Sequence, residues 1–320
     1  MKKKVLITAL SFRRSPEGLA LLRDNGLDVV LSPQERPLKE AELLAQLAGI
    51  SAIVAGNDMI TEKVIAAGVP ELKVIARSGV GYNTIDVAAA QRHGVLVTNT
   101  PGANSRSVAE LTLGLMISLA RNIPQANDEM HSGGWVNRVG MELGGKTLGI
   151  VGTGNIGGEV LKRASAFGME LIAFDTWRRR DLIESFGDIY RPLDEVFSRA
   201  DFLSLHVPAI PETIGMVNKT MLRRMKPSAY LINTSRGELI TEEDLAEALK
   251  AKLISGAALD AFTAEPLPPD SSLRNLNNVI LTPHIGASTG ESAKRASIMA
   301  AEEVIRVLSG AVAYFPVPLP

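Results

Sequence analysis

The sequence predicts an α/β protein built from two parallel-sheet domains, and three observations lead to this fold class. Short apolar, β-branched runs alternate with amphipathic stretches, which is typical of a parallel sheet with helices on both faces. The alternation is interrupted once by a long stretch of helical periodicity and then starts again. A chain of 320 residues is also long for a single hydrophobic core, so two domains are expected.

Five strands are expected in the first part of the chain, with amphipathic helices between them. The expected strands are Val5–Ala9, Asp28–Leu31, Ala52–Ala55, Lys73–Ala76 and Val95–Thr98. The expected helices are Pro16–Asn25, Glu40–Ala48, Glu62–Ala67 and Val87–His93. A glycine follows each of these helices, where a left-handed cap residue is expected to stop it.

A single long helix is expected from Ser105 to His131, at the passage between the two domains. The glycine-rich segment Ser132–Gly145 follows it, and the alternation of strands and helices then restarts. The expected strands are Thr147–Val151, Glu170–Asp175, Asp201–His206, Ala229–Asn233, Gly256–Leu259 and Val279–Leu281. A last helix, at about Gly290–Ser309, runs into a proline-rich tail.

The composition excludes several classes of protein. An apolar fraction of 46% with 22% charged residues is typical of a soluble globular chain. A net charge of −1 provides neither a basic field for nucleic acid nor a polybasic patch for a membrane. Without cysteine there are no disulfides, thiolate metal sites or cysteine nucleophiles, and no metal site is expected. No apolar stretch suffices for a signal peptide or a membrane span, so we expect a cytoplasmic protein.

The strongest local motif is G-x-G-x-x-G, which directly follows an expected strand and opens the expected helix Asn155–Phe167. Its glycines permit a tight turn, a close approach of the backbone to a pyrophosphate, and close packing of helix on strand. These glycines are Gly152, Gly154 and Gly157. At the start of the helix, the N–H groups of Asn155 and Ile156 can face the phosphates. The motif predicts a dinucleotide-binding site.

An acidic residue strengthens this interpretation over the alternative of a glycine-rich connection. Asp175 ends the next expected strand, 23 positions after Gly152, where a carboxylate accepts hydrogen bonds from ribose hydroxyls. The same carboxylate would repel a 2′-phosphate, so the sequence favours NAD over NADP. Arg178, Arg179 and Arg180 follow directly. They fit an exposed basic turn better than a phosphate site, but tolerance of NADP stays open.

A second phosphate-type pattern, G-x-x-x-x-G-K-[ST], covers residues 140–147. A phosphate loop needs a strand before it and a helix after it. Here a helical segment precedes the pattern and a strand follows, so we interpret the match as coincidence.

Three reactive side chains follow three successive expected strands. They are Arg236, Glu265 and His284. Ligands of open α/β sheets bind at the carboxyl ends of the strands. Histidine titrates near neutrality and suits proton exchange with a hydroxyl group. Each residue alone has an ordinary structural explanation, but the three together at one edge predict an acid–base site.

The other three histidines have simpler explanations. His93 and His131 lie at helix ends, where a contact with the helix dipole accounts for them. His206 ends an expected strand and could line the cofactor cleft.

Seven stretches spread over most of residues 50–300 match the motifs of one known family. They are Ala76–Gly81, Asn99–Ser105, Ala109–Gly114, Gly145–Gly157, Asn233–Gly237, Gly256–Pro266 and Thr282–Thr289. In these stretches the chain resembles the D-isomer-specific 2-hydroxyacid dehydrogenases, and most closely their phosphoglycerate dehydrogenase branch.

The resemblance implies two Rossmann-like or flavodoxin-like domains with an active-site cleft between them. The substrate-binding domain would comprise residues 1–99 and 288–320, and the NAD-binding Rossmann domain residues 100–287. The implied activity is hydride transfer between NAD and a D-2-hydroxy acid, either 3-phosphoglycerate or a related small acid. The helix Ser105–His131 is similar to the family's dimerisation element, so a homodimer is implied.

The resemblance also assigns a role to each reactive residue. Arg236 would bind the substrate carboxylate and polarise the carbonyl. His284 would take the hydroxyl proton during oxidation and return it in reduction, and Glu265 would orient the imidazole and stabilise its protonated form. Further implied cofactor contacts are Val207, Pro208, Thr234, Asp260 and Gly286. Implied substrate contacts are Arg77, Ser78, Gly79, Val80, Gly81 and Asn104, where the turn 78–81 would form an anion nest of N–H groups.

The chain departs from the phosphoglycerate pattern in two ways. It ends at Pro320, where long phosphoglycerate dehydrogenases continue into regulatory domains, so we expect the short branch without serine feedback. The phosphoglycerate enzymes commonly have an arginine after the strand matched here by Ala52–Val54, and this chain has Ala55–Asn57 instead. Arg77 matches a second phosphate-side arginine, and Arg138 can reach across a dimer. Loss of one bidentate clamp makes an unphosphorylated or differently charged acid at least as well supported as 3-phosphoglycerate.

Other classes of protein fit the sequence less well. An NAD-sensing, non-enzymatic binding protein of the same fold would lack a member of the triad, and none is lacking. A hydrolase or phosphotransferase needs a nucleophile elbow, a metal-ligand cluster or a genuine phosphate loop. Dehydrogenases of formate or phosphite stay open as alternatives, although Ser78–Gly81 and Asn99–Ser105 favour the phosphoglycerate branch.

Overall fold

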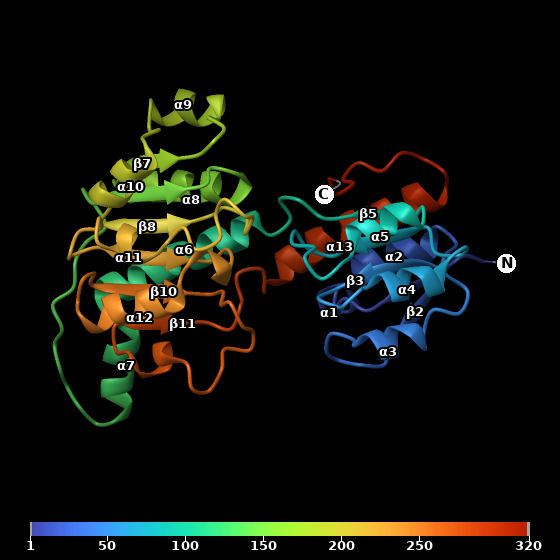
Figure 1. Ribbon diagram of the computed structural model, residues 1–320, viewed down its shortest axis with the longest axis horizontal. Helices are drawn as coiled ribbons and strands as arrows, with labels where there is room; N and C mark the ends of the chain where they lie inside the picture. Colours follow the sequence, from blue (N-terminus) through green and yellow to red (C-terminus); the bar gives the residue numbers. More distant parts are fainter. Residues whose placement is uncertain (1, 319–320) are drawn as a thin grey trace. The chain divides into compact units, whose positions relative to one another are not determined.

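The computed structural model describes residues 2–318, and the chain divides into two compact units. The first comprises Met1–Asn104 with Ala287–Pro320, and the second Ser105–Gly286. Each unit contains one parallel sheet with helices on both faces (Figure 1). The predicted α/β class with two parallel-sheet domains is therefore confirmed. The predicted domain bounds, 1–99 with 288–320 and 100–287, stay a prediction and differ from the unit bounds by a few residues.

The sheet of the first unit has the strand order β2-β1-β3-β4-β5, and all neighbouring strands are parallel. The strands are β1 (Lys4–Ile7), β2 (Asp28–Leu31), β3 (Ile50–Ala55), β4 (Val74–Arg77) and β5 (Leu96–Thr98). The order reverses between β1 and β3, and ligands of such sheets bind at the carboxyl end of this switch point. The loops after β1 and β3 therefore lie at a favoured position for a ligand.

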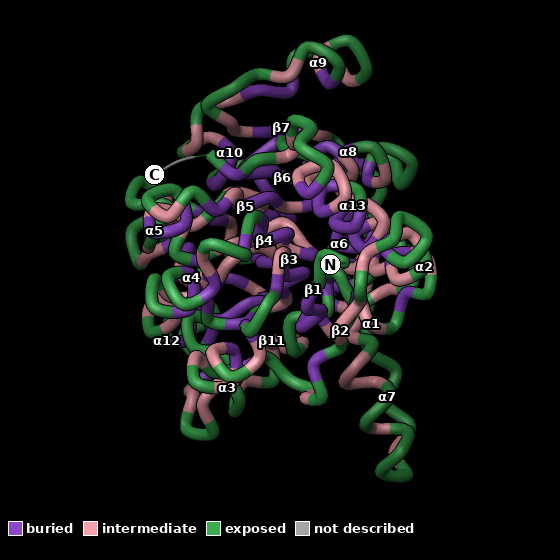
Figure 2. Tube along the Cα trace, turned by 90° about the vertical axis from the view of Figure 1, so that its right-hand side faces the viewer, coloured by how far each residue is buried: buried purple, intermediate pink, exposed green. Residues whose placement is uncertain are grey.

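Alternate side chains of these strands enter two separate cores, because successive residues of a strand point to opposite faces. Val5 and Ile7 pack in one core and Leu6 in the other. Helices on the first face are α1 (Leu10–Arg13), α2 (Pro16–Asp24) and α13 (Gly290–Leu308). Helices on the second face are α3 (Glu40–Leu44), α4 (Glu62–Gly68) and α5 (Val87–Arg92). Figure 2 shows the buried central strands of this sheet and the exposed outer sides of its helices.

Side-chain caps determine where two of these helices begin. The carboxylate of Asp86 accepts a hydrogen bond from the N–H of Ala89 at 2.8 Å, at the start of α5. The hydroxyl of Thr289 accepts one from the N–H of Ser292 at 3.1 Å, at the start of α13. Each cap satisfies a donor that the first helical turn leaves unpaired.

The sheet of the second unit has the order β11-β10-β9-β8-β6-β7 and is also parallel throughout. Its strands are β6 (Thr147–Val151), β7 (Glu170–Phe174), β8 (Phe202–Leu205), β9 (Tyr230–Asn233), β10 (Gly256–Leu259) and β11 (Val279–Leu281). The chain reverses direction along the sheet between β6 and β8, so the switch point follows β6. The expected strands of both units are present, with small shifts of their ends.

Two layers of helices cover the second sheet. The helices α6 (Ser105–Arg121) and α8 (Asn155–Ala166) lie on one face. The helices α10 (Leu193–Arg199), α11 (Lys219–Leu222) and α12 (Glu242–Lys250) lie on the other. The remaining elements are α7 (Ile123–His131), α9 (Arg180–Phe186), η1 (Gly237–Leu239) and η2 (Ser272–Asn275). Among the described helices of either unit, none has both the length and the apolar character needed to cross a membrane.

The predicted single helix Ser105–His131 is wrong, because the chain breaks at Asn122. This residue has a φ of 53°, in the left-handed region, and separates α6 from α7. Pro124 lies in the first turn of α7, where its missing N–H group does no harm, but it cannot continue a preceding helix. α7 contains no buried residue and is coloured as exposed or intermediate along its length in Figure 2.

Candidate active site

The glycine motif lies at the carboxyl end of β6, at the switch point of the second sheet. Gly152 has a φ of 96°, and a Cβ at this position would lie 2.6 Å from the carbonyl oxygen of His206. A Cβ on Gly157 would lie 2.0 Å from the carbonyl oxygen of Gly152. Neither position can hold a side chain, so the turn and α8 pack directly together, as the motif predicts.

The middle glycine of the motif, Gly154, faces open space. A Cβ built on Gly154 meets no atom of the described residues within 4 Å. α8 begins directly after it, and the N–H groups of Asn155 and Ile156 have no partner within the helix. Open space in front of a helix N-terminus suits the negative charge of a pyrophosphate. The loop therefore fits a dinucleotide.

Asp175, directly after β7, is held beside this loop. Its Oδ2 accepts hydrogen bonds from the N–H of Thr153 at 2.6 Å and from the hydroxyl of Thr153 at 3.0 Å. Its Oδ1 accepts one from the N–H of Trp177 at 3.0 Å. These bonds fix the carboxylate where the sequence predicts the ribose hydroxyls of the cofactor.

Arg179 braces the glycine loop from within the unit. Its Nη1 donates to the carbonyl oxygens of Thr153 and Gly154 at 3.1 and 3.0 Å. The same guanidinium forms an ion pair with Asp181 at 2.5 Å. The hydrogen bond from Arg179 lowers the pKa of the Asp181 carboxyl below its ordinary value. The sequence did not indicate this brace, since it depends on how α9 packs beside the loop.

The two neighbouring arginines also have partners within the unit. The guanidinium carbon of Arg178 lies 5.7 Å from the centre of the Tyr190 ring, and Arg180 forms an ion pair with Glu184 at 2.8 Å. All three arginines of this turn are therefore engaged, which counts against their use for a 2′-phosphate.

His284 and Glu265 form a hydrogen-bonded pair in the loops that follow β11 and β10. The His284 Nδ1 atom lies 2.9 Å from each carboxylate oxygen of Glu265. Glu265 Oε1 also accepts a hydrogen bond from the N–H of Phe262 at 3.1 Å. Both side chains are partly exposed, and Nε2 of His284 pairs with none of the described residues. The pair thus orients an imidazole through one nitrogen and leaves the other available for proton exchange.

The backbone of His284 has an unusual conformation that a buried acid supports. Its φ is 52°, which is uncommon for residues other than glycine and is frequent at functional sites. Asp260 is 2% exposed, and its Oδ1 accepts from the hydroxyl of Thr282 at 2.6 Å and from the N–H of Ile285 at 2.9 Å. Its Oδ2 accepts from the N–H of Gly286 at 2.8 Å. Asp260, at the end of β10, therefore fastens the histidine loop on both sides.

Arg236 lies in the loop after β9, which packs against the loop of the carboxylate. Asn233 shapes this loop: its Nδ2 donates to the carbonyl of Arg236 at 2.8 Å, and its Oδ1 accepts from the N–H of Ser235 at 3.0 Å. A Cβ on Gly237 would lie 1.9 Å from the carbonyl carbon of Phe262. The two loops are thus in direct backbone contact, and the structure brings all three predicted triad loops to one edge of the second sheet.

The other predicted cofactor residues lie at this same edge. The carbonyl of Val207 accepts a hydrogen bond from the hydroxyl of Ser235 at 2.6 Å, and Pro208 follows it. The hydroxyl oxygen of Thr234 lies 2.9 Å from that of Thr112 on α6. Their contacts with the cofactor stay predictions, as does that of Asp260, whose carboxylate oxygens both bond to the histidine loop.

The predicted substrate turn, Ser78–Gly81, lies at the carboxyl end of β4 in the first unit. All four of its carbonyl groups accept hydrogen bonds: two from Arg77, one from the N–H of Thr100 at 3.1 Å and one from the amide of Asn99 at 2.8 Å. The N–H groups of the last two residues of the turn pair with none of the described residues. The turn is therefore arranged as an anion nest.

Asn104, the last of the predicted substrate residues, ends the first segment of the first unit. Its Oδ1 atom is buried and has no hydrogen-bond partner among residues 2–318. A buried acceptor without a partner is costly, so this atom is available for a ligand. Its role toward substrate stays a prediction.

The backbone of His206 lies directly against the glycine loop, at Gly152. Its Nε2 lies 2.9 Å from the hydroxyl oxygen of Ser204, whereas its Nδ1 is buried without a partner among the described residues. Burial lowers the pKa of His206 to about 3, so the imidazole is neutral at physiological pH. A group held neutral in this way does not suit proton exchange near pH 7, which leaves that role to His284.

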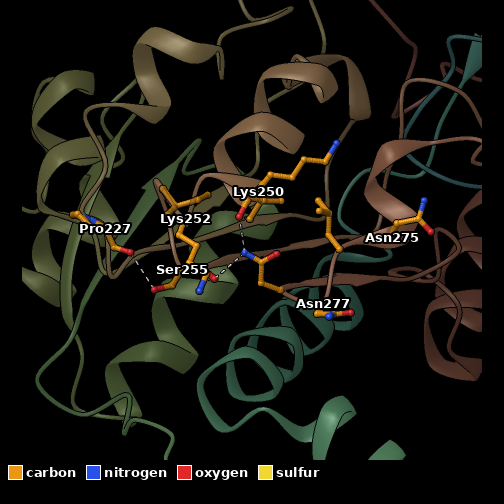
Figure 3. A pocket seen from close by; sticks show the side chains of 10 residues that line it. Pro227, Lys250, Lys252, Ser255, Asn275 and Asn277 are labelled. Carbon is orange, nitrogen blue, oxygen red and sulfur yellow. Dashed lines mark hydrogen bonds between the residues drawn. The ribbon is translucent and has the colours of Figure 1, made fainter.

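A hollow of about 690 Å³ lies at the opposite edge of the second sheet (Figure 3). Its walls come from segments that precede β9, β10 and β11, including Pro227, Ser255 and Asn278. The Asn278 amide donates to the carbonyls of Leu249 and Ser255 at 3.2 and 3.3 Å, so it links these segments. No predicted site residue lines this hollow, and the candidate site is at the carboxyl edge.

The second unit has a glycine loop at the switch point of its sheet, and an arginine and a carboxylate–imidazole pair lie at the same edge. This combination is typical of dinucleotide-dependent dehydrogenases. A model of the family described as "D-isomer specific 2-hydroxyacid dehydrogenase, NAD binding domain" matches residues 113–286. The chain belongs to the D-isomer specific 2-hydroxyacid dehydrogenase family, and its cofactor is NAD. Both the predicted family and the predicted cofactor are confirmed.

The chain is similar to two groups of enzymes, D-3-phosphoglycerate dehydrogenases and glyoxylate reductases. It is 44% identical over 286 residues to D-3-phosphoglycerate dehydrogenase of Methanocaldococcus jannaschii, covering 88% of the chain and 54% of that protein. It is 37% identical over 320 residues to glyoxylate reductase of Korarchaeum cryptofilum, covering 98% and 95%. A crystal structure of a protein from Thermus thermophilus has a TM-score of 0.90 and 36% identity, over 98% of this chain and 100% of that one. The chain thus spans about half the length of the phosphoglycerate dehydrogenase and nearly all of the reductase.

Replacing Asp175 by Ala should relax the preference for NAD. The substitution removes a charged acceptor for the ribose hydroxyls, and hydrogen bonds to charged groups contribute about 1.5–3 kcal/mol, which is about tenfold or more in affinity. Titration of NADH and NADPH by fluorescence measures the two dissociation constants. We expect their ratio to shift toward NADPH in this variant and not in Asp188→Ala, which removes an exposed acid of the same unit; an unchanged ratio contradicts the ribose role of Asp175.

His206 should make the stability of the protein depend on pH. Its pKa is lowered in the folded state, so unfolding takes up a proton below the ordinary pKa of about 6.5. The free energy of unfolding is therefore expected to decrease by about 1.4 kcal/mol per pH unit from this group as the pH falls from about 6.5 toward 3. Urea unfolding of His206→Gln at about pH 7 and 5.5 should show a smaller pH dependence than the wild type. His93→Gln is the control, and equal pH dependence in His206→Gln and wild type would rule out a buried neutral imidazole.

Proposed function

We propose that the protein is an NAD-dependent oxidoreductase that transfers a hydride between NAD and a small D-2-hydroxy acid. The observation that carries this proposal is the His284–Glu265 pair, with Nδ1 held at 2.9 Å by the carboxylate and Nε2 unpaired among the described residues. NAD supplies the chemistry of accepting the hydride in oxidation and returning it in reduction. The residues of the chain then need only to bind the acid and to move one proton.

The proton is assigned to Nε2 of His284. In oxidation this nitrogen takes the proton of the substrate hydroxyl, and in reduction it returns a proton to the carbonyl oxygen. Glu265 keeps the imidazole oriented and stabilises its positive charge after proton uptake. Arg236 lies on the adjoining loop and is assigned to the substrate carboxylate and carbonyl, because a guanidinium binds such oxygens by paired hydrogen bonds.

The turn Ser78–Gly81 is assigned to the substrate carboxylate as well. Its carbonyl groups are all engaged and its last two N–H groups are not, so it presents positive partial charge to an anion. Arg77 and Asn104 are the further substrate residues of this proposal. The relatives act, by name, on 3-phosphoglycerate and on glyoxylate, and both acids are candidates for this chain.

We propose that the active form is a homodimer. The segment from α7 to residue 139 carries exposed large apolar side chains, which favour contact with another protein surface. They are Ile123, Met130, Trp135, Val136 and Val139, between 47% and 95% exposed. The cytoplasmic location predicted from the sequence stays a prediction. The NAD-sensing, non-enzymatic alternative has no observation in its favour.

A substrate panel with the variant His284→Asn tests the proposal. The panel contains 3-phosphoglycerate, glycerate, lactate, malate and sulfolactate with NAD, and glyoxylate with NADH, followed by NADH absorbance. We expect turnover of at least one acid, and a loss of about 10²–10⁴ in kcat in His284→Asn because general acid–base catalysis is removed. Affinity for NADH should be nearly unchanged.

His93, at the end of α5 in the first unit, provides a matched control outside the proposed site and dimer surface, and His93→Asn should keep the wild-type rate. Equal activity of wild type and His284→Asn would remove the acid–base assignment. Wild-type protein that binds NADH but turns over none of these acids would favour the non-enzymatic alternative.

A further inference from the structure

We propose that Asn57 and Arg77 form a clamp that fixes the substrate turn and directs the site toward small, unphosphorylated 2-hydroxy and 2-oxo acids. This inference rests on the proposed function and names its substrate class. The guanidinium of Arg77 is here a structural brace of the turn and not a phosphate-binding group. Asn57 is a positioning residue that acts through Arg77.

Each nitrogen of the Arg77 guanidinium donates a hydrogen bond within the first unit. Nε donates to the carbonyl of Gly81 at 2.8 Å, Nη1 to the carbonyl of Ser78, and Nη2 to Oδ1 of Asn57 at 2.6 Å. The guanidinium thus bridges the first and last residues of the turn and anchors them to the loop after β3. A Cβ on Gly79 would lie 2.4 Å from Nη1, so the side chain lies directly against the backbone of the turn.

The loop that carries Asn57 is itself fixed by a buried carboxylate. Asp58 is fully buried; its Oδ1 accepts from the N–H of Leu38 at 2.7 Å, and its Oδ2 from the N–H of Gly56 at 2.9 Å. Oδ2 also accepts from the hydroxyl of Thr8. Thr8 follows β1 and Asp58 follows β3, so this bond joins the two strands of the switch point. The bonds of Asp58 therefore fix the loop of Asn57, and Asn57 in turn accepts a hydrogen bond from Arg77.

This arrangement has a consequence for the charge of the substrate. Arginine binds phosphate best through two parallel N–H groups of one edge of the guanidinium. Three of the five N–H groups of the Arg77 guanidinium already bond to the turn or to Asn57, so a phosphate that binds through both nitrogens of one edge competes with these bonds. The neighbouring buried side chain, Asp58, is acidic and adds no basic group to this edge of the sheet. The clamp strengthens the carboxylate nest and leaves Arg77 less available to a second anionic group.

The variants Arg77→Lys and Asn57→Ala test the clamp by steady-state kinetics with glycerate and 3-phosphoglycerate. The wild type should have the higher kcat/KM with glycerate. Lysine cannot make the three directed bonds, so Arg77→Lys should raise KM for glycerate about tenfold or more, because hydrogen bonds to charged groups are lost. The change in kcat should be smaller, and KM for NAD should not change. Asn57→Ala removes the acceptor of the Arg77 Nη2 group. It should therefore raise KM for glycerate and reduce the difference in kcat/KM between glycerate and 3-phosphoglycerate.

Two substitutions of the same chemical kind elsewhere in the first unit serve as controls. Arg92, on α5, is exposed and pairs with Glu62, and Asn25 is exposed at the end of α2. Arg92→Lys and Asn25→Ala should keep wild-type KM values. The clamp is refuted if the wild type prefers 3-phosphoglycerate and Arg77→Lys impairs only that acid, or if Arg77→Lys behaves like Arg92→Lys.

Amide hydrogen exchange tests the clamp without any need for turnover, so it separates a failure of this inference from a failure of the proposed function. The N–H groups of Ser78, Gly79 and Thr100 are bonded to the carbonyls of Ala55, Arg77 and Gly79 in the folded protein. Arg77→Lys and Asn57→Ala should accelerate exchange at these amides, whether or not an acid is turned over. Absence of turnover of every acid in the panel, together with faster exchange, would refute the proposed function and keep the brace. Unchanged exchange would refute the brace itself.

Discussion

The buried carboxylate of Asp260 is the interaction on which the candidate active site depends. It belongs to the end of β10, yet both its oxygens bond to the loop after β11, at Thr282, Ile285 and Gly286. Between these contacts His284 has a positive φ, and its imidazole is hydrogen-bonded to the carboxylate of Glu265. A left-handed conformation at a non-glycine residue persists only when its surroundings hold it, and Asp260 is what holds the histidine loop.

The two units share one structural feature, a buried acidic side chain that fixes a loop. In each, a buried acid at a carboxyl sheet edge accepts backbone N–H groups and so fixes the loop that carries functional side chains. Asp58 does this in the first unit for the loop of Asn57, and Asp260 in the second for the loop of His284. Such a polar side chain can be buried because hydrogen bonds to its oxygens replace the lost hydration. The loops gain rigidity that their short, irregular sequences do not provide.

Much of this could be predicted from the sequence, because the signals are local. β-branched runs indicate the strands, and the glycine spacing indicates the dinucleotide loop. The carboxyl ends of successive parallel strands bring Arg236, Glu265 and His284 to one edge. The break at Asn122 could have been predicted from an asparagine shortly before a proline. The brace of Arg179 and the clamp of Arg77 could not, since their partners depend on how loops distant in sequence pack.

Hydrogen exchange in the variant Asp260→Asn tests the central claim most directly. Asparagine replaces one acceptor oxygen by an NH2 group, which cannot accept a bond from an N–H. Ile285 and Gly286 donate to different oxygens of Asp260, so the amide that faces the NH2 group loses its acceptor. The account predicts exchange at this amide that is faster by about tenfold or more, the effect expected for loss of a hydrogen bond, together with a lower kcat. Wild-type exchange at both amides with a lower kcat would contradict it, because Asp260 would then act on catalysis without holding the histidine loop.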